Sequence, residues 1–250
     1  MLLDGFYPAD IRVRKETINN VRVLRKIHYN SFAEKGIIDI RIAINFIHPK
    51  FYKILPEIIT ENKIDVLHVH DLPLAKTGLK MAKKYNLKSV LDLHENYPAA
   101  LLTWFSWRKS PIVRLKNKLF FSYNRWQKYE NKIIKKYNQI IAVVEEMKSR
   151  IVLDTSIKFD KITVITNSEK KDFAANFSTE QNTFFKDYKD KFIISYVGGF
   201  GPHRGLQTAI EGMQEISKEI PNSILALIGP ANKDVKEYLE NLIDKFNVRE

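Results

Sequence analysis

Along the chain, short apolar runs alternate with longer stretches whose apolar residues have helical spacing. The short runs, rich in Val and Ile, predict buried strands over residues 37–46, 66–70, 89–93, 140–144, 162–165, 192–197 and 223–228. Apolar residues recurring every three or four positions predict helices over residues 11–31, 53–62, 74–85, 145–152 and 206–213. Because strands and helices alternate, the pattern predicts an α/β fold with parallel, doubly wound sheets.

The same pattern divides into two Rossmann-like units separated by a polar segment. Residues 1–171 form the first unit, and residues 172–190, rich in Asn, Lys and Asp, predict a linker. A second βαβ pattern starts in residues 191–250 and is incomplete. Residues 1–4 resemble the tail of a first strand, and residues 247–250 stop just after a helix. We therefore expect the sequence to be a fragment of a longer protein.

A glycine-rich loop connects the predicted strand 192–197 to the helix that follows. It contains Gly198, Gly199, Gly201 and Gly205, with Arg204 beside the start of the helix. Glycine lets the backbone approach a ligand closely, and a helix N-terminus offers free N–H groups to a phosphate. The guanidinium of Arg204 adds donors that fit phosphate oxygens. The loop predicts a diphosphate site, but its spacing matches neither the dinucleotide fingerprint nor the Walker loop, which argues against NAD and ATP.

The net charge of +12 and the pI near 9.6 leave nucleic acid, an anionic membrane surface and phosphorylated substrates open as partners. The absence of cysteine excludes disulfides and cysteine-based zinc sites. No apolar run has the length of a membrane span, and the N-terminus lacks a signal-peptide layout. We expect a cytoplasmic protein.

Polar residues follow two of the predicted strands directly. His68, His70 and Asp71 end the strand at 66–70, while His94 and Glu95 follow the strand at 89–93. Open α/β sheets bind ligands at the carboxyl ends of their strands, so these residues are candidates for a cleft. A histidine there can donate to a sugar hydroxyl or move a proton.

His68 and His70 share one face of a strand, where a pair of histidines could also hold a metal. The longer H-x-H-x-D-H pattern of metal-dependent hydrolases breaks off after Asp71. We predict no metal, and a metal-dependent hydrolase using His68, His70 and His94 stays an alternative.

Charged residues open the predicted helix at residues 11–31. Asp10, Arg12 and Arg14 either form a solvated helix start or face the cleft at the end of the first strand.

Residues 104–136 combine aromatic with basic side chains and contain a single acid, Glu130. From Ile112 onward the spacing suits an amphipathic helix. This composition is typical of a helix lying on an anionic membrane, although single-stranded nucleic acid or an ordinary core-facing helix would also fit. Composition alone leaves the membrane and the core-facing helix open; we keep docking on an anionic membrane as a hypothesis and expect no nucleic-acid partner. The membrane-facing candidates are Trp104, Trp107, Arg108, Lys109, Lys116 and Lys118.

Six segments taken together resemble retaining glycosyltransferases of the GT-B fold and the family 4 type. They are residues 6–16, 66–73, 91–98, 140–148, 162–167 and 198–206. The resemblance implies two facing Rossmann-like domains, with the nucleotide sugar mainly on the second and a glycan or lipid-linked acceptor mainly on the first.

The resemblance also implies roles for individual residues. Gly198, Gly199 and Arg204 would bind the donor diphosphate, and His94 would lie near the reacting sugar as the catalytic residue. The cleft and acceptor side would contain Asp10, Arg12, Arg14, Asp71 and Glu95. No cofactor or metal is implied, since basic residues and helix dipoles stabilise the leaving diphosphate.

Two features depart from the family pattern. Many members carry an Arg directly after the first glycine of the loop, where this chain has Gly199. The family's E-x7-E helix, which contacts the donor, would lie beyond Glu250. We therefore expect no transferase activity from these residues alone. A non-catalytic sugar-nucleotide-binding relative remains an alternative to an enzyme of polysaccharide or glycolipid assembly at the inner face of a membrane.

Overall fold

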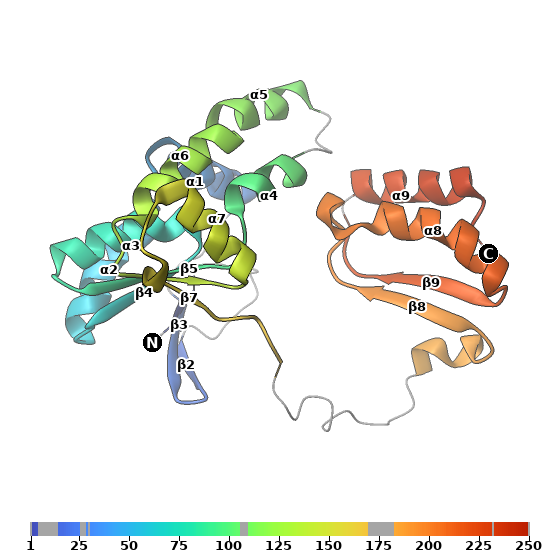
Figure 1. The fold of residues 1–250 in the computed structure, drawn as a ribbon, viewed down its shortest axis with the longest axis horizontal. Coiled ribbons are helices and arrows are strands. Elements are labelled where there is room, and N and C mark those ends of the chain that lie inside the picture. The colour runs from blue at the N-terminus through green and yellow to red at the C-terminus, as the bar shows by residue number, and fades with distance from the viewer. Residues whose placement is uncertain are drawn as a thin grey trace. The chain divides into compact units, whose positions relative to one another are not determined.

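The computed structural model describes residues 2–4, 15–25, 29, 31–105, 110–169, 183–231 and 233–249. The chain divides into two compact units (Figure 1). Unit 1 comprises Met1–Leu101 and Ile112–Asn167, and unit 2 comprises Leu102–Pro111 and Ser168–Glu250. The predicted domain boundaries 1–171, 172–190 and 191–250 stay predictions.

The main sheet of unit 1 is fully parallel. Its strands, in spatial order, are β4 (Val66–His70), β5 (Lys88–Leu93), β6 (Gln139–Ala142) and β7 (Ile162–Val164). Helix α3 (Leu72–Lys84) packs on β4 and β5, and α7 (Glu145–Thr155) packs on β6 and β7. Helix α6 (Tyr123–Ile134) contacts both α3 and α7 (Figure 1). The predicted alternation of parallel strands and helices is confirmed for this part of the chain.

A smaller sheet in unit 1 contradicts the helix predicted over residues 11–31. Its strands are β1 (Leu2–Asp4), β2 (Lys15–Ile18) and β3 (Val21–Arg25), in the order β1-β3-β2. β1 pairs parallel to β3, whereas β2 and β3 form an antiparallel hairpin. The turn residues Asn19 and Asn20 have φ angles of 48° and 65°. Asparagine tolerates this left-handed conformation, which a two-residue hairpin turn requires.

The strand predicted over residues 37–46 is also wrong. Those residues lie in α1 (Phe32–Asn45), which is followed by α2 (Pro49–Glu61). Ser31 caps α1, because its Oγ accepts a hydrogen bond from the backbone N–H of Glu34 at 3.1 Å. Ile38, Ile42 and Ala43 are buried, as the helical period requires.

Unit 2 contains a two-stranded parallel sheet, β8 (Phe192–Val197) and β9 (Ser223–Ile228). Helices α8 (Leu206–Glu219) and α9 (Lys233–Phe246) lie together on one face of this sheet (Figure 1). A core cluster of Leu206, Ile210, Val235 and Leu239 joins the two helices, and Tyr196, Leu225 and Leu227 of the sheet pack against it. The remaining elements are α4 (Tyr97–Trp104), α5 (Pro111–Phe120) and the 3-10 helices η1 (Phe159–Lys161), η2 (Thr183–Tyr188) and η3 (Pro202–Arg204).

Candidate functional site

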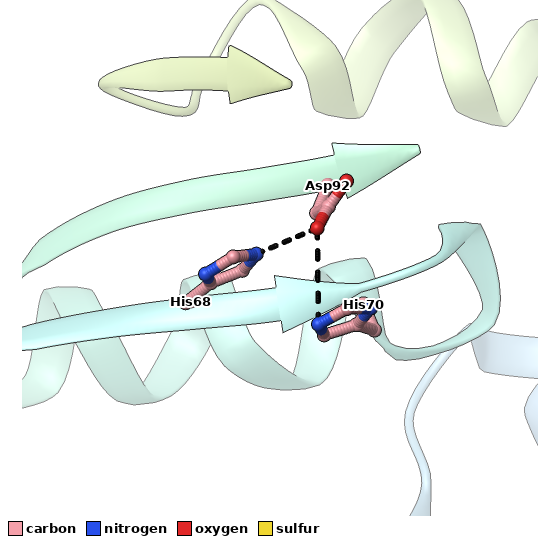
Figure 2. Close-up of side chains that lie close together, drawn as sticks. All are labelled: His68, His70 and Asp92. Atoms are coloured by element: carbon pink, nitrogen blue, oxygen red, sulfur yellow. Dashed lines mark hydrogen bonds and ion pairs between the residues drawn. The ribbon is translucent and has the colours of Figure 1, made fainter. Parts of the chain in front are cut away.

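Three histidines surround one aspartate at the carboxyl edge of β4 and β5. Asp92 Oδ2 lies 2.9 Å from Nε2 of His68, 3.7 Å from Nε2 of His70 and 3.3 Å from Nε2 of His94. The imidazole rings of His68 and His70 stack with centroids 4.9 Å apart, and those of His70 and His94 with centroids 5.0 Å apart. Figure 2 shows His68 and His70 both turned toward Asp92. We call these four residues the histidine cluster.

The pleat and register of the sheet explain this cluster. Alternate residues of a strand share a face, and His70 is the direct cross-strand partner of Asp92. His68, two residues earlier, reaches Asp92 diagonally. The Asp92 side chain is 9% exposed, whereas those of His68 and His70 are 47% and 52% exposed. A buried carboxylate therefore lies beneath two imidazoles that are open to solvent.

Asp92 is the member of the cluster that we did not predict from the sequence. An acidic residue between Leu91 and Leu93 in an apolar strand was the available signal, since buried carboxylates are rare without a partner.

The loops after β4 and β5 are joined through Asp71. Its backbone N–H donates to the carbonyl of Asp92 at 2.8 Å, and its Oδ1 accepts from the backbone N–H of His94 at 3.2 Å. Asp71 has a φ of 62° and a ψ of 157°, a conformation that side-chain-bearing residues rarely adopt. Such strain persists where the surroundings fix it, and it often marks functional loops. The predicted cleft residues Asp71 and His94 are thus in direct contact.

Glu95 lies beside this pair of loops. Burial raises the pKa of its carboxyl group, the charge of Asp71 raises it further, and His94 acts in the opposite direction. Burial likewise raises the pKa of Tyr97, the first residue of α4, whose ring lies against Trp126 with a centroid distance of 4.7 Å. The edge of β5 therefore offers an imidazole and a carboxyl group whose pKa is raised by its surroundings.

The glycine loop of unit 2 runs from the end of β8 through η3 to α8. Gly198 has a φ of 157°, and a Cβ there would lie 2.8 Å from the hydroxyl oxygen of Tyr196. A Cβ on Gly229, at the end of β9, would collide with the carbonyl oxygen of Gly198. The close approach of the two strand ends thus requires glycine at Gly229, and the φ of Gly198 favours glycine there, whereas Gly199 faces open space.

Helix α8 begins directly after Gly205, whose φ is 72° and which has no side chain to cap the helix. Arg204 is exposed, and no hydrogen bond or ion pair engages its guanidinium within the described residues. The guanidinium beside the start of α8 is therefore available to an anion. The loop geometry fits the predicted diphosphate site, whose binding role remains a prediction.

The basic and aromatic segment at residues 104–136, for which membrane docking was a hypothesis, begins at the last residue of α4 and contains α5 and α6. On α5 the side chains of Ile112, Leu115 and Leu119 are 81%, 60% and 58% exposed, although they recur on one helical face. Lys118 is exposed on the same helix, while Lys116 is half-buried and lies 5.8 Å from the ring centroid of Phe121.

A basic groove of about 770 Å³ lies between α3 and α6. Its floor is apolar, with Phe46, Leu79, Tyr129 and Ile133. Its basic residues, with no acid among the lining side chains, are Lys76, Lys80, Lys83, Arg125, Lys128, Lys132 and Lys136. Burial lowers the pKa of Lys76, and the charges of Lys80 and Lys136 lower it further.

Several predicted site residues fall outside the described residues: Asp10, Arg12, Arg14, Trp107, Arg108 and Lys109. Trp104, at the end of α4, is half-buried. No helix in the described part of the chain is both long and apolar enough to cross a membrane.

The fold and the strand-end loops define the class: an α/β protein of the GT-B type. The most similar solved structures include a sucrose-phosphate synthase from Thermosynechococcus elongatus, with a TM-score of 0.66, 13% identity and coverage of 99% of this chain and 57% of that one. They also include the Anabaena protein HepE in complex with UDP-glucose, with a TM-score of 0.54, 12% identity and coverage of 79% and 49%.

The sequence comparisons name the family. Residues 33–168 match the model of Glycosyltransferase Family 4. The alpha-monoglucosyldiacylglycerol synthase of Acholeplasma laidlawii is 26% identical over 196 residues, which are 73% of this chain and 45% of that protein. The chain thus spans less than half the length of this curated relative. This chain belongs to Glycosyltransferase Family 4, as the sequence motifs predicted.

Proposed function

We propose that this chain is part of a retaining glycosyltransferase that moves a sugar from a nucleoside diphosphate sugar to a lipid-linked acceptor at an anionic membrane surface. Family membership and the exposed Arg204 beside the start of α8 support the donor side of the proposal. The likeness to HepE, solved with UDP-glucose, favours uridine as the base. A single observation carries the membrane side: the exposed apolar face of α5.

Each part of the site has a role in this proposal. The amides at the start of α8 and the guanidinium of Arg204 bind the diphosphate and stabilise the charge that develops as it leaves. Gly198 keeps the loop backbone close enough for its amides to take part. His94 binds a hydroxyl of the sugar or acceptor, and Asp71 holds the backbone of His94 in position. No metal is needed for these roles.

Glycolipid assembly is the favoured process. The Acholeplasma relative is named as a synthase of a glycolipid, and an enzyme with such an acceptor must reach a bilayer. Ile112, Leu115 and Leu119 can insert into the interfacial region, while the basic groove attracts anionic headgroups.

A metal-dependent hydrolase is less well supported, because the chain belongs to a transferase family. A non-catalytic sugar-nucleotide binder would retain the diphosphate site and differ only in turnover.

UDP titration by calorimetry tests the donor side. Arg204→Ala should weaken UDP binding about tenfold, because one charge-assisted contact to phosphate is lost. The matched control is Arg249→Ala, which removes an equally exposed arginine paired with Asp244 elsewhere in unit 2. Equal UDP affinity for Arg204→Ala and the wild type would refute the diphosphate assignment.

Vesicle flotation tests the membrane side. The triple variant Ile112→Ser, Leu115→Ser, Leu119→Ser should lose recovery with phosphatidylglycerol vesicles, whereas the wild type should float with them and not with neutral phosphatidylcholine vesicles. Leu153→Ser on α7 is the control, because Leu153 is 82% exposed but lies on another helix. Undiminished flotation of the triple variant would exclude α5 as the docking element.

A further inference from the structure

Asp92 is a buried carboxylate that no permanent cation neutralises. Its partners in the described part of the chain are three imidazoles, and no Lys or Arg pairs with it. Its second oxygen, Oδ1, is buried and has no hydrogen-bond partner among the described residues. Burying a carboxylate is costly unless it is paired with a positive charge or coordinates a metal. A cation bound between these side chains would supply that positive charge.

The arrangement of the ligand atoms suits a small cation. One nitrogen each of His68 and His70 and one oxygen of Asp92 all lie within 4.8 Å of one another. In a tetrahedral site with bonds of 2.0–2.1 Å, neighbouring ligand atoms are about 3.3 Å apart. The distances of 2.9 and 3.7 Å from Asp92 Oδ2 to the two nitrogens bracket that value. A modest adjustment of the exposed imidazoles would bring all three atoms onto one ion.

We propose that His68, His70 and Asp92 form a binding site for a divalent transition-metal ion of the zinc class. Two imidazoles and one carboxylate favour zinc, cobalt, nickel or copper over magnesium and calcium, which prefer oxygen ligands. Three protein ligands leave a fourth position for solvent. The two half-exposed imidazoles provide the entry path. The sugar-transfer proposal itself needs no metal, although Asp92 Oδ2 also lies 3.3 Å from Nε2 of His94.

Zinc titration by calorimetry, on protein without an affinity tag, tests this site. The wild type should bind one equivalent of zinc at neutral pH, and a large excess of magnesium should not displace it. The double variant His68→Asn, His70→Asn should weaken zinc binding by at least about 100-fold, because both nitrogen ligands are lost. Since both imidazoles are exposed, the variant should keep the fold of the wild type, which its circular dichroism spectrum checks.

The matched control is His203→Asn, which removes an exposed histidine from the glycine loop and should leave zinc binding unchanged. Substitution with cobalt gives a second readout, because tetrahedral coordination produces visible absorption bands that the double variant should lack. The proposal fails if the wild type binds no zinc, if the double variant binds as tightly as the wild type, or if His203→Asn is the variant that loses the ion.

Discussion

Two buried carboxylates in unit 1 have opposite surroundings. Glu130 on α6 is 0% exposed, and its oxygens accept from Arg150 of α7 at 2.7 and 3.3 Å. Gln127 adds a contact of 3.4 Å to the same carboxylate. Asp92 on β5 lies beneath half-exposed imidazoles, and its Oδ1 has no hydrogen-bond partner in the described part of the chain.

The difference separates a structural ion pair from a site. Burial acts to lower the pKa of Arg150, but the hydrogen bond and the charge of Glu130 outweigh it, so the guanidinium stays charged and holds α6 against α7. The imidazoles of His68 and His70, by contrast, are half-exposed and can be reached from solvent. The pair of Glu130 and Arg150 is closed, whereas the cluster at Asp92 is open to solvent.

The largest effect on the free energy of unfolding should come from breaking the closed pair of Glu130 and Arg150. Arg150→Met leaves Glu130 buried with no cation in contact, and the free energy of unfolding should fall by about 3–5 kcal/mol. Urea denaturation followed by the fluorescence of Trp126, which lies on α6 and is fully buried, measures this.

Two variants make that result specific. The double variant Glu130→Leu, Arg150→Met removes both charges and should recover most of the loss, because a buried pair can be replaced by apolar side chains. Arg249→Met disrupts an exposed pair with Asp244 and should change stability by less than about 1 kcal/mol. Similar losses for Arg150→Met and Arg249→Met would show that burial of Glu130 does not matter.

The fold could be predicted where the signals are local. The strands at 66–70, 192–197 and 223–228 match β4, β8 and β9, because short runs rich in Val, Ile and Leu are typical of strands. The two wrong predictions concern residues 37–46 and 11–31. In both, the spacing of apolar residues favoured one kind of element, while a local capping or turn signal specified another. The alternation in residues 37–46 favoured a strand, but Ser31 and Glu34 form the capping pair that starts α1. The apolar spacing in residues 11–31 favoured a helix, but Asn19 and Asn20 mark a hairpin turn.

The candidate site was predictable only in part. A cluster of glycines in the sequence directly indicates a loop whose backbone can line a site. Gly198 and Arg204 could therefore be proposed for the diphosphate site from the local pattern alone. The histidine cluster depends on the register of β4 against β5, which places Asp92 beside His70 across 21 intervening residues. No local pattern specifies that register. Asp92 was therefore missed although His68, His70 and His94 were all named.

A buried histidine provides the second prediction. His48 caps α2 with Nδ1 accepting from the backbone N–H of Phe51 at 3.3 Å, and its Nε2 lies 2.9 Å from the hydroxyl of Tyr29. Burial lowers the pKa of His48 to about 4, Asp39 opposes the shift, and Lys50 adds to it. Below pH 6.5 the imidazole of His48 becomes protonated in the unfolded chain, whereas in the folded chain it stays neutral down to about pH 4. His48 should therefore remove about 3 kcal/mol of stability between pH 6.5 and pH 4, and nothing above that range.

Chemical denaturation across that pH range measures the effect. His48→Asn keeps a side chain that can cap a helix but cannot be protonated, so its profile should be flatter than that of the wild type by that amount. Parallel profiles for the two proteins would mean that His48 accepts a proton in the folded state.

The smallest change is expected at Asp92 itself. Asp92→Asn keeps the shape and one acceptor oxygen, and the imidazoles of His68 and His70 beside it can hydrogen-bond to water, since both are half-exposed. The metal-free protein should lose only about 1 kcal/mol of stability, the value of an ordinary hydrogen bond. Glu130→Gln is the matched carboxylate-to-amide change, and it should cost several times more because Arg150 remains buried beside a neutral group. Equal losses for the two amide variants, measured by urea denaturation in the presence of a chelator, would make Asp92 a structural carboxylate like Glu130 and remove the distinction between the closed pair and the open cluster.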